Sequence, residues 1–127
     1  MRYLMALMLI ALVATGCGDD EPEGGEETVT APTGPADTSM PGDPVAGEAV
    51  YNTSCIACHG ADGRGNGGVG GDFQGEPERL AQDNAVLLAK IRDGITGNRV
   101  MPPHNNVLTD EQQKDALSYI RREWGQQ

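Results

Sequence analysis

Apolar residues recur at the spacing of an amphipathic helix in three segments, at about residues 43–55, 83–92 and 109–124. No segment alternates apolar and polar residues convincingly enough to predict a strand. The pattern therefore predicts an all-α domain. The expected apolar positions are Gly47, Tyr51 and Cys55 in the first helix, Leu87, Leu88 and Ile91 in the second, and Ala116, Leu117, Ile120 and Trp124 in the third.

Residues that favour helix ends lie beside each of these stripes. Asp43 is a good N-cap, and Pro44 after it suits the first helical position. Gly94 fits the C-terminal end of the second helix. Residues 109–112, Thr-Asp-Glu-Gln, form a capping box that opens the third helix, and Gly125 ends it. The three apolar faces are expected to enclose a common centre.

The first 17 residues resemble a bacterial lipoprotein signal peptide. Arg2 supplies a positive start, and residues 4–13 form an apolar run much shorter than the ~20 residues of a membrane-spanning helix. Residues 14–17, Ala-Thr-Gly-Cys, are similar to a lipobox, so we predict a cleaved leader and lipid on Cys17. Cleavage without lipid is the alternative, because leucine is more usual than alanine in this lipobox. We expect an exported protein on the periplasmic side of a bacterial membrane.

Residues 18–44 are acidic and rich in proline. They contain eight Asp or Glu side chains, five prolines and no Lys or Arg. Few apolar groups are available there to offset the entropy lost on ordering, so the pattern predicts a disordered tether. As a coil, such a tether spans about 30 Å.

The remaining domain, residues 45–127, carries 8 basic and 11 acidic side chains, so its net charge is −3 out of −10 for the whole chain. No basic patch is visible, and we expect no nucleic-acid partner. With one Phe and one Trp in the chain, the core is thin. A domain this small usually needs an additional staple.

Residues 55–59 read Cys-x-x-Cys-His, the signature of covalent attachment of c-type haem. Thiols three positions apart lie on one side of a helical turn, where Cys55 and Cys58 can each add to a vinyl group of one porphyrin. The imidazole of His59 then lies beneath the ring as an axial iron ligand. A thioredoxin-like redox pair and half of a zinc site are the alternatives, although neither a βαβ setting nor enough zinc ligands is evident. One covalent haem c would also complete the thin core.

Residues 45–127 resemble a class I cytochrome c domain over their whole length. The resemblance implies a small helical domain wrapped around one covalent haem, with the first and last helices crossing so that Gly47 and Tyr51 lie near Tyr119. The glycine-rich loop at 63–68 also matches a dinucleotide motif, but no strand precedes it. The matching segments are Gly47 and Tyr51, residues 55–60, the glycine-rich loop, and residues 91–94 (Ile-Arg-Asp-Gly), 100–103 (Val-Met-Pro-Pro), 108–111 (Leu-Thr-Asp-Glu) and 119–120 (Tyr-Ile).

The sixth iron ligand is expected to be Met101. The other four methionines lie in the leader or the tether, and the family has a Met-Pro pair at this point. Two prolines after Met101 stiffen the loop that presents its sulfur. His104 is the alternative ligand. Arg64 and Arg99 flank the haem loops and are candidates for pairing with the haem propionates.

One departure from the family concerns the partner of the proximal histidine. In related domains a Gly-Pro pair follows the glycine-rich loop, and the proline carbonyl accepts the N–H bond of that histidine. This chain reads Gly71-Asp72-Phe73, with Asp72 in place of the proline. We expect a backbone carbonyl to remain available, without the geometry that a proline fixes.

Two axial ligands from the protein leave no position for a substrate on the iron. The chemistry that remains is outer-sphere electron transfer, so we predict a membrane-tethered electron carrier and not an enzyme. Its partners are expected to be redox proteins, an electron donor and an electron acceptor, without a small-molecule substrate. Two alternatives stay open. One is a haem enzyme or gas sensor with a displaceable sixth ligand, and the other is a fixed cytochrome c subunit of a respiratory complex.

Overall fold

The computed structural model describes residues 34–125, so the expected leader, Cys17 and the first part of the tether lie outside the described residues. Within the described range the chain is helical and contains no strand, which confirms the all-α prediction. One isolated antiparallel bridge joins Ile95 and Met101. The elements are α1 (Pro44–Ser54), α2 (Ile56–His59), the 3₁₀ turns η1 (Asn66–Gly68) and η2 (Pro77–Arg79), α3 (Asn84–Asp93) and α4 (Asp110–Trp124).

The helix ends form for the reasons that the sequence indicates. The Asp43 carboxylate accepts a hydrogen bond from the Val45 backbone N–H at 2.8 Å, and Pro44 is the first residue of α1. Thr109 and Gln112 form the reciprocal capping box of α4. These side chains satisfy backbone donors that a helix leaves unpaired at its start. The predicted ends of the first and last helices are confirmed.

Gly47 allows α1 and α4 to pack against each other closely. A Cβ at this position would lie 1.9 Å from the carbonyl oxygen of Asp115 and 2.9 Å from the Cβ of Tyr119. The ring of Tyr51, one turn later in α1, packs on that of Tyr119 with centroids 5.2 Å apart. The approach of the first and last helices, which the resemblance implied, is confirmed.

The core joins α1, α3 and α4 to the segment that follows the glycine-rich loop. Tyr51 and Leu117 are each 1% exposed, and the predicted stripes of all three helices contribute to one cluster. Trp124 is central to it, because its ring lies 5.3 Å from that of Tyr51 and 5.6 Å from that of Phe73. The aromatic side chains therefore connect the last helix to the loop after α2.

A buried arginine ties α4 to the start of α3. Arg121 donates hydrogen bonds to the side-chain oxygen of Asn84 at 2.8 Å and to the carbonyls of Leu80 and Gln82 at 2.6 and 2.8 Å. Three acceptors offset the cost of removing a guanidinium from water. The segment before α3 is thus held against the last helix.

The last residues of the expected tether lie along this domain. The backbone N–H of Asp37 donates to Asp83, and the N–H of Gly42 donates to the Ser118 hydroxyl, at 2.9 and 2.7 Å. The Asn84 N–H donates to the Asp37 carbonyl at 2.8 Å. These hydrogen bonds hold residues from Asp37 on, which the sequence pattern assigns to the tether, against the helices. The contacts are made by backbone donors and polar side chains, which a pattern of apolar positions does not detect.

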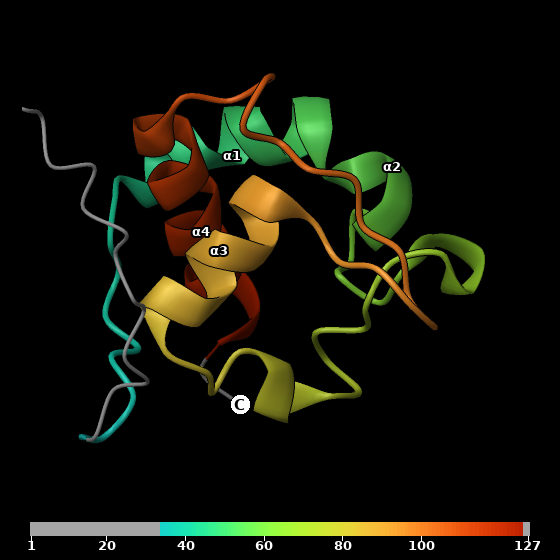
Figure 1. Cartoon of the computed structure of the whole chain (residues 1–127), viewed down its shortest axis with the longest axis horizontal. Coiled ribbons are helices and arrows are strands. Elements are labelled where there is room, and N and C mark those ends of the chain that lie inside the picture. Colours follow the sequence, from blue (N-terminus) through green and yellow to red (C-terminus); the bar gives the residue numbers. More distant parts are fainter. Residues whose placement is uncertain (1–33, 126–127) are drawn as a thin grey trace, which may run out of the picture. The chain divides into compact units, whose positions relative to one another are not determined.

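The connection between α3 and α4 is long. Among the connections between the α-helices, only the one between α2 and α3, which contains the glycine-rich loop, is longer. Figure 1 shows this segment, residues 94–109, leaving the end of α3, reaching out on the side of α2 and returning to the start of α4. It carries both Met101 and His104. Among residues 34–125, no helix has the length and apolar character needed to span a bilayer.

Candidate functional site

A cavity of about 330 Å³ lies between the helices and the two long connecting segments. Its volume falls within the range of about 300–1,000 Å³ that is usual for small-molecule and cofactor sites. Cys55, Cys58, His59 and Met101 all line it, so the structure brings together the four residues predicted for haem binding. The apolar part of the wall comprises Val69, Phe73, Leu80, Leu87, Ile91, Ile95, Val100, Leu117 and Ile120.

The two motif cysteines lie at the junction of α1 and α2. Cys55 is both the C-cap of α1 and the N-cap of α2. The backbone N–H groups of Cys58 and His59 both donate to its carbonyl. Both thiols are free, with Cys55 buried and Cys58 half-buried. Burial first, and the nearby Cys58 second, raise the pKa of the Cys55 thiol to about 11. Among the described residues, no group of three or more His, Cys, Asp or Glu side chains gathers as metal ligands do.

His59 is fixed by one hydrogen bond and one ring contact. Its Nδ1 lies 3.3 Å from the carbonyl oxygen of Gly71, as an N–H donor in the tautomer that leaves Nε2 free for a ligand. Its ring stacks on Phe73 with centroids 4.7 Å apart and an interplanar angle of 11°. Burial lowers the pKa of His59, which favours the neutral imidazole that binds metal ions.

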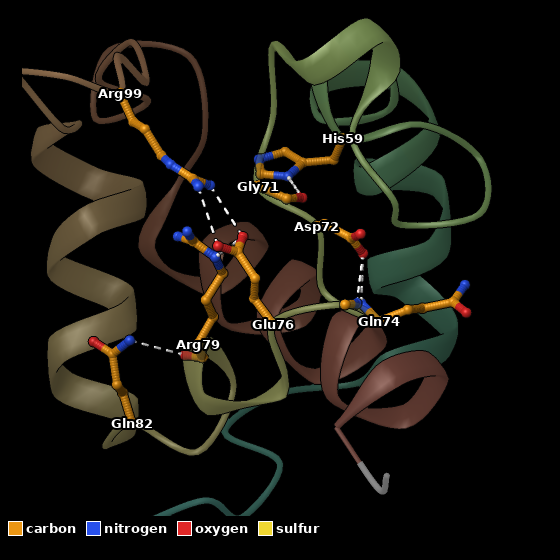
Figure 2. A network of polar contacts seen from close by, with 9 residues as sticks. His59, Gly71, Asp72, Gln74, Glu76, Arg79, Gln82 and Arg99 are labelled. Atoms are coloured by element: carbon orange, nitrogen blue, oxygen red, sulfur yellow. Dashed lines mark hydrogen bonds and ion pairs between the residues drawn. The ribbon is translucent and has the colours of Figure 1, made fainter.

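A backbone carbonyl remains available to His59, as the sequence analysis expected. Gly71, and not Asp72, supplies the oxygen that the family takes from a proline. The Asp72 side chain instead accepts hydrogen bonds from the backbone N–H groups of Gln74 and Gly75 at 2.9 and 2.7 Å. Figure 2 shows the Gly71 carbonyl under the imidazole and the Asp72 carboxylate turned toward Gln74. Asp72 therefore stabilises the turn that follows the acceptor.

Met101 is held by its backbone close to the end of α3. Its N–H and carbonyl pair with those of Ile95 at 3.0 and 2.9 Å. Gly94, at φ +79°, comes so near that a Cβ there would lie 2.5 Å from the Met101 carbonyl oxygen. Only glycine adopts this conformation without strain and leaves room for the loop. Pro102 follows, so the backbone on both sides of Met101 is restricted.

His104, the alternative ligand, lines the same cavity. Its backbone N–H donates to the carbonyls of Ile91 and Arg92, at 3.1 and 3.2 Å, which fixes its position below α3. Its ring Nδ1 is buried and has no hydrogen-bond partner among the described residues. Geometry alone therefore leaves two side chains, Met101 and His104, as candidates for the second axial position.

Cationic side chains form one part of the cavity wall. Arg79, Lys90 and Arg99 line it, and Lys90 donates a hydrogen bond to Gln82. Arg64, named with Arg99 from the sequence, is not part of this wall and donates instead to Gln74 at 2.8 Å. The sequence analysis missed Arg79 and Lys90. The position of Lys90, next to the apolar stripe of α3, was a usable signal, whereas nothing in the sequence marks Arg79.

The residues around this cavity fit a covalently attached porphyrin. Two thiols and an oriented imidazole come from the turn at residues 55–59, and a thioether comes from Met101, far along the sequence. Apolar side chains cover much of the wall. The wall also carries three cations, two of which pair with Glu76, so it keeps a net positive charge that suits negatively charged propionate groups. Covalent attachment of haem c uses the thiols and the imidazole, and the thioether and the apolar wall suit the porphyrin.

Comparison with known proteins gives a family match over most of the domain. Residues 42–120 match the model described as "Cytochrome C oxidase, cbb3-type, subunit III". The chain is 36% identical over 81 residues to cytochrome c-555 of Chlorobaculum tepidum, a match that covers 61% of this chain and 74% of the relative. It is 32% identical over 81 residues to the cbb3-type cytochrome c oxidase subunit FixP of Sinorhizobium medicae. That match covers 59% of this chain and only 28% of FixP.

Solved structures have the same fold. The KustC0563 c-type cytochrome superposes with a TM-score of 0.52 at 25% identity, covering 61% of this chain and 95% of that one. The c-type cytochrome XoxG from Methylobacterium extorquens AM1 superposes with a TM-score of 0.51 at 20% identity. The match covers 65% of this chain and 51% of XoxG, so it bears on the fold alone.

Proposed function

The chain belongs to the cytochrome c family, through the domain described as cytochrome c oxidase, cbb3-type, subunit III, and we propose that it carries single electrons between redox proteins. Its cofactor is haem c, and Cys55 and Cys58 fit the motif that attaches it. Members of this family are electron carriers. The tether, the location and the partners are further parts of the proposal.

In this proposal, His59 and Met101 are the two residues that would hold the haem iron. The observation that carries it is that both side chains line one cavity together with the two cysteines. The Gly71 carbonyl and the Phe73 ring keep the imidazole in one orientation, and the Ile95 bridge restrains the Met101 backbone. A rigid ligand set favours electron transfer, because little needs to move when the charge of the site changes.

Bound haem supplies the ferric/ferrous couple, and a thioether opposite histidine raises its reduction potential. The chain supplies the rest. Leu87, Ile91 and Ile120 exclude water from the wall, while Val69 and Val100 are 66% and 71% exposed at its edge. An apolar, exposed edge is where a partner protein comes closest to the site. With both residues on the iron, a substrate would find no free coordination position.

The direct test of the carrier proposal is a potentiometric titration of the haem-loaded full chain. We expect one reversible step with the slope of a one-electron couple, unchanged between oxidative and reductive directions. The reason is that one haem with two protein ligands exchanges one electron without gaining or losing a ligand. Hysteresis between the two directions, or a step that needs a small-molecule substrate, would count against a simple carrier.

We also propose that the domain is held at the periplasmic side of a membrane by lipid on Cys17, with the acidic tether between anchor and domain. Mass spectrometry of the mature N-terminus decides this. We expect a diacylated or triacylated Cys17, whereas an unmodified mature N-terminus would indicate a freely diffusing carrier. Crosslinking in native membranes should recover separate donor and acceptor proteins. Stoichiometric co-purification with an oxidase would favour the alternative of a fixed subunit.

A further inference from the structure

The segment that presents Met101 is attached to the domain mainly at its base. This methionine loop, residues 95–103, is closed by the bridge between Ile95 and Met101. Directly after it, the N–H groups of His104 and Asn105 donate to carbonyls at the end of α3. The far part of the loop is exposed, with Val100 at 71%. Packing therefore fixes the ends of the methionine loop better than its middle.

One side chain connects the middle of the methionine loop to another part of the cavity wall. Arg99, two residues before Met101, donates from both terminal nitrogens to the Glu76 carboxylate, at 3.0 and 3.1 Å. Glu76 lies directly before η2, whose last residue, Arg79, lines the cavity. Figure 2 shows Arg99 extending from its loop to meet Glu76, with the Arg79 guanidinium beside it. A two-bond pair of this kind restrains direction as well as distance.

Glu76 is itself held in place for this contact. The Arg79 Nε donates to its Oε2 at 2.6 Å, so the carboxylate lies between two guanidinium groups. Arg79 first, and Arg99 second, lower the pKa of Glu76 to about 2. The carboxylate is charged at neutral pH, as its pair with Arg99 requires.

We propose that Glu76 is a positioning residue, which acts through Arg99 to hold the methionine loop so that Met101 stays on the iron. This inference rests on the proposed function, because it takes Met101 as the axial ligand. Loss of the pair leaves the loop attached at its base only, and Met101 then gives way more readily to a competing ligand. Arg99 and Glu76 are 56% and 31% exposed, so solvent screens the pair and the expected effect is modest.

The test is imidazole binding to the ferric, haem-loaded full chain, at a pH where free imidazole is neutral. Imidazole competes with Met101 for the iron, so its affinity reports how firmly the loop is held. We expect Glu76→Gln and Arg99→Gln each to raise imidazole affinity on the order of threefold to tenfold. The double variant should bind no more tightly than the single variants, because both remove the same contact. High salt should raise the affinity of the wild type and leave that of the variants unchanged.

The signs of the two single effects separate a mechanical role from a purely electrostatic one. Glu76→Gln removes a negative charge near the site, and Arg99→Gln removes a positive one. A field effect on the iron therefore shifts imidazole affinity in opposite directions, whereas loss of the pair shifts it in the same direction. Arg99→Lys should restore part of the wild-type affinity. Arg122→Gln is the control, since it removes ion pairs with Glu48 at 3.7 Å and Glu123 at 2.8 Å and a contact with the Tyr119 ring, none of which involves the cavity.

Each result has one meaning for this inference. Equal-signed, non-additive effects with an unchanged Arg122→Gln variant support it. Opposite signs, full additivity or wild-type affinity in both single variants overturn it while leaving Met101 as the ligand. A wild-type ferric spectrum without the methionine-to-iron band overturns the ligand assignment, and the positioning role falls with it.

Discussion

Replacing both Cys55 and Cys58 by serine is expected to leave little folded protein. The cavity of about 330 Å³ lies at the centre of the domain and is walled by core residues of α3 and α4. Without the porphyrin, the apolar side chains of this wall lose their packing partner, at a cost on the order of several kcal/mol. Small domains have a net stability of only about 5–15 kcal/mol, so the porphyrin decides whether this one folds.

Haem staining on a denaturing gel, combined with circular dichroism of the purified protein, measures this outcome. The double variant should lose the stain and most of its helical signal. A single Cys58→Ser variant is a useful comparison, because one thioether bond still retains the porphyrin. A double variant that is well folded and free of haem would contradict the idea that the porphyrin forms part of the core.

Met101→Ala is expected to change the electronic state of the site strongly. Ferric haem with a methionine ligand shows a weak long-wavelength sulfur-to-iron band, which bis-histidine haem lacks. The substitution should abolish this band and lower the reduction potential on the order of 0.1 V, because the thioether that stabilises ferrous iron is lost. The oxidised absorption spectrum and a potentiometric titration measure the two effects.

His104→Ala is the control for this assignment. The two side chains line the same cavity, and the His104 Nδ1 is buried without a partner, so the substitution removes the alternative ligand without altering Met101. The band and the potential should both stay close to those of the wild type. If His104→Ala removes the low-spin spectrum while Met101→Ala preserves it, the ligand assignment is reversed.

The helices were predictable because their signals are local. The Asp43 cap of α1, the Thr109 capping box of α4 and the apolar stripes can each be recognised within a short stretch of sequence. The structure contains each of them. The four haem-binding candidates were also predictable, since three lie in one motif and Met101 follows from its Met-Pro context. Their convergence on one cavity needed the fold.

What the sequence could not provide depends on contacts between distant segments. Glu76 and Arg99 are 23 positions apart, and nothing local indicates that they pair. The choice of Gly71 over Asp72 as the acceptor from His59 depends on the path of the backbone, because every residue carries a carbonyl. The contacts of Asp37 with the start of α3 are single hydrogen bonds, which no apolar pattern reveals.

The central claim, that the protein itself fills both axial positions and leaves electron transfer as the function, is tested most directly by carbon monoxide. Carbon monoxide is added to the reduced wild-type protein, and the absorption spectrum is followed, with Met101→Ala as the positive control. We predict that the wild-type spectrum stays unchanged while the variant forms the carbon monoxide complex. Ready formation of that complex by the wild type would contradict the account and favour a sensor or an enzyme.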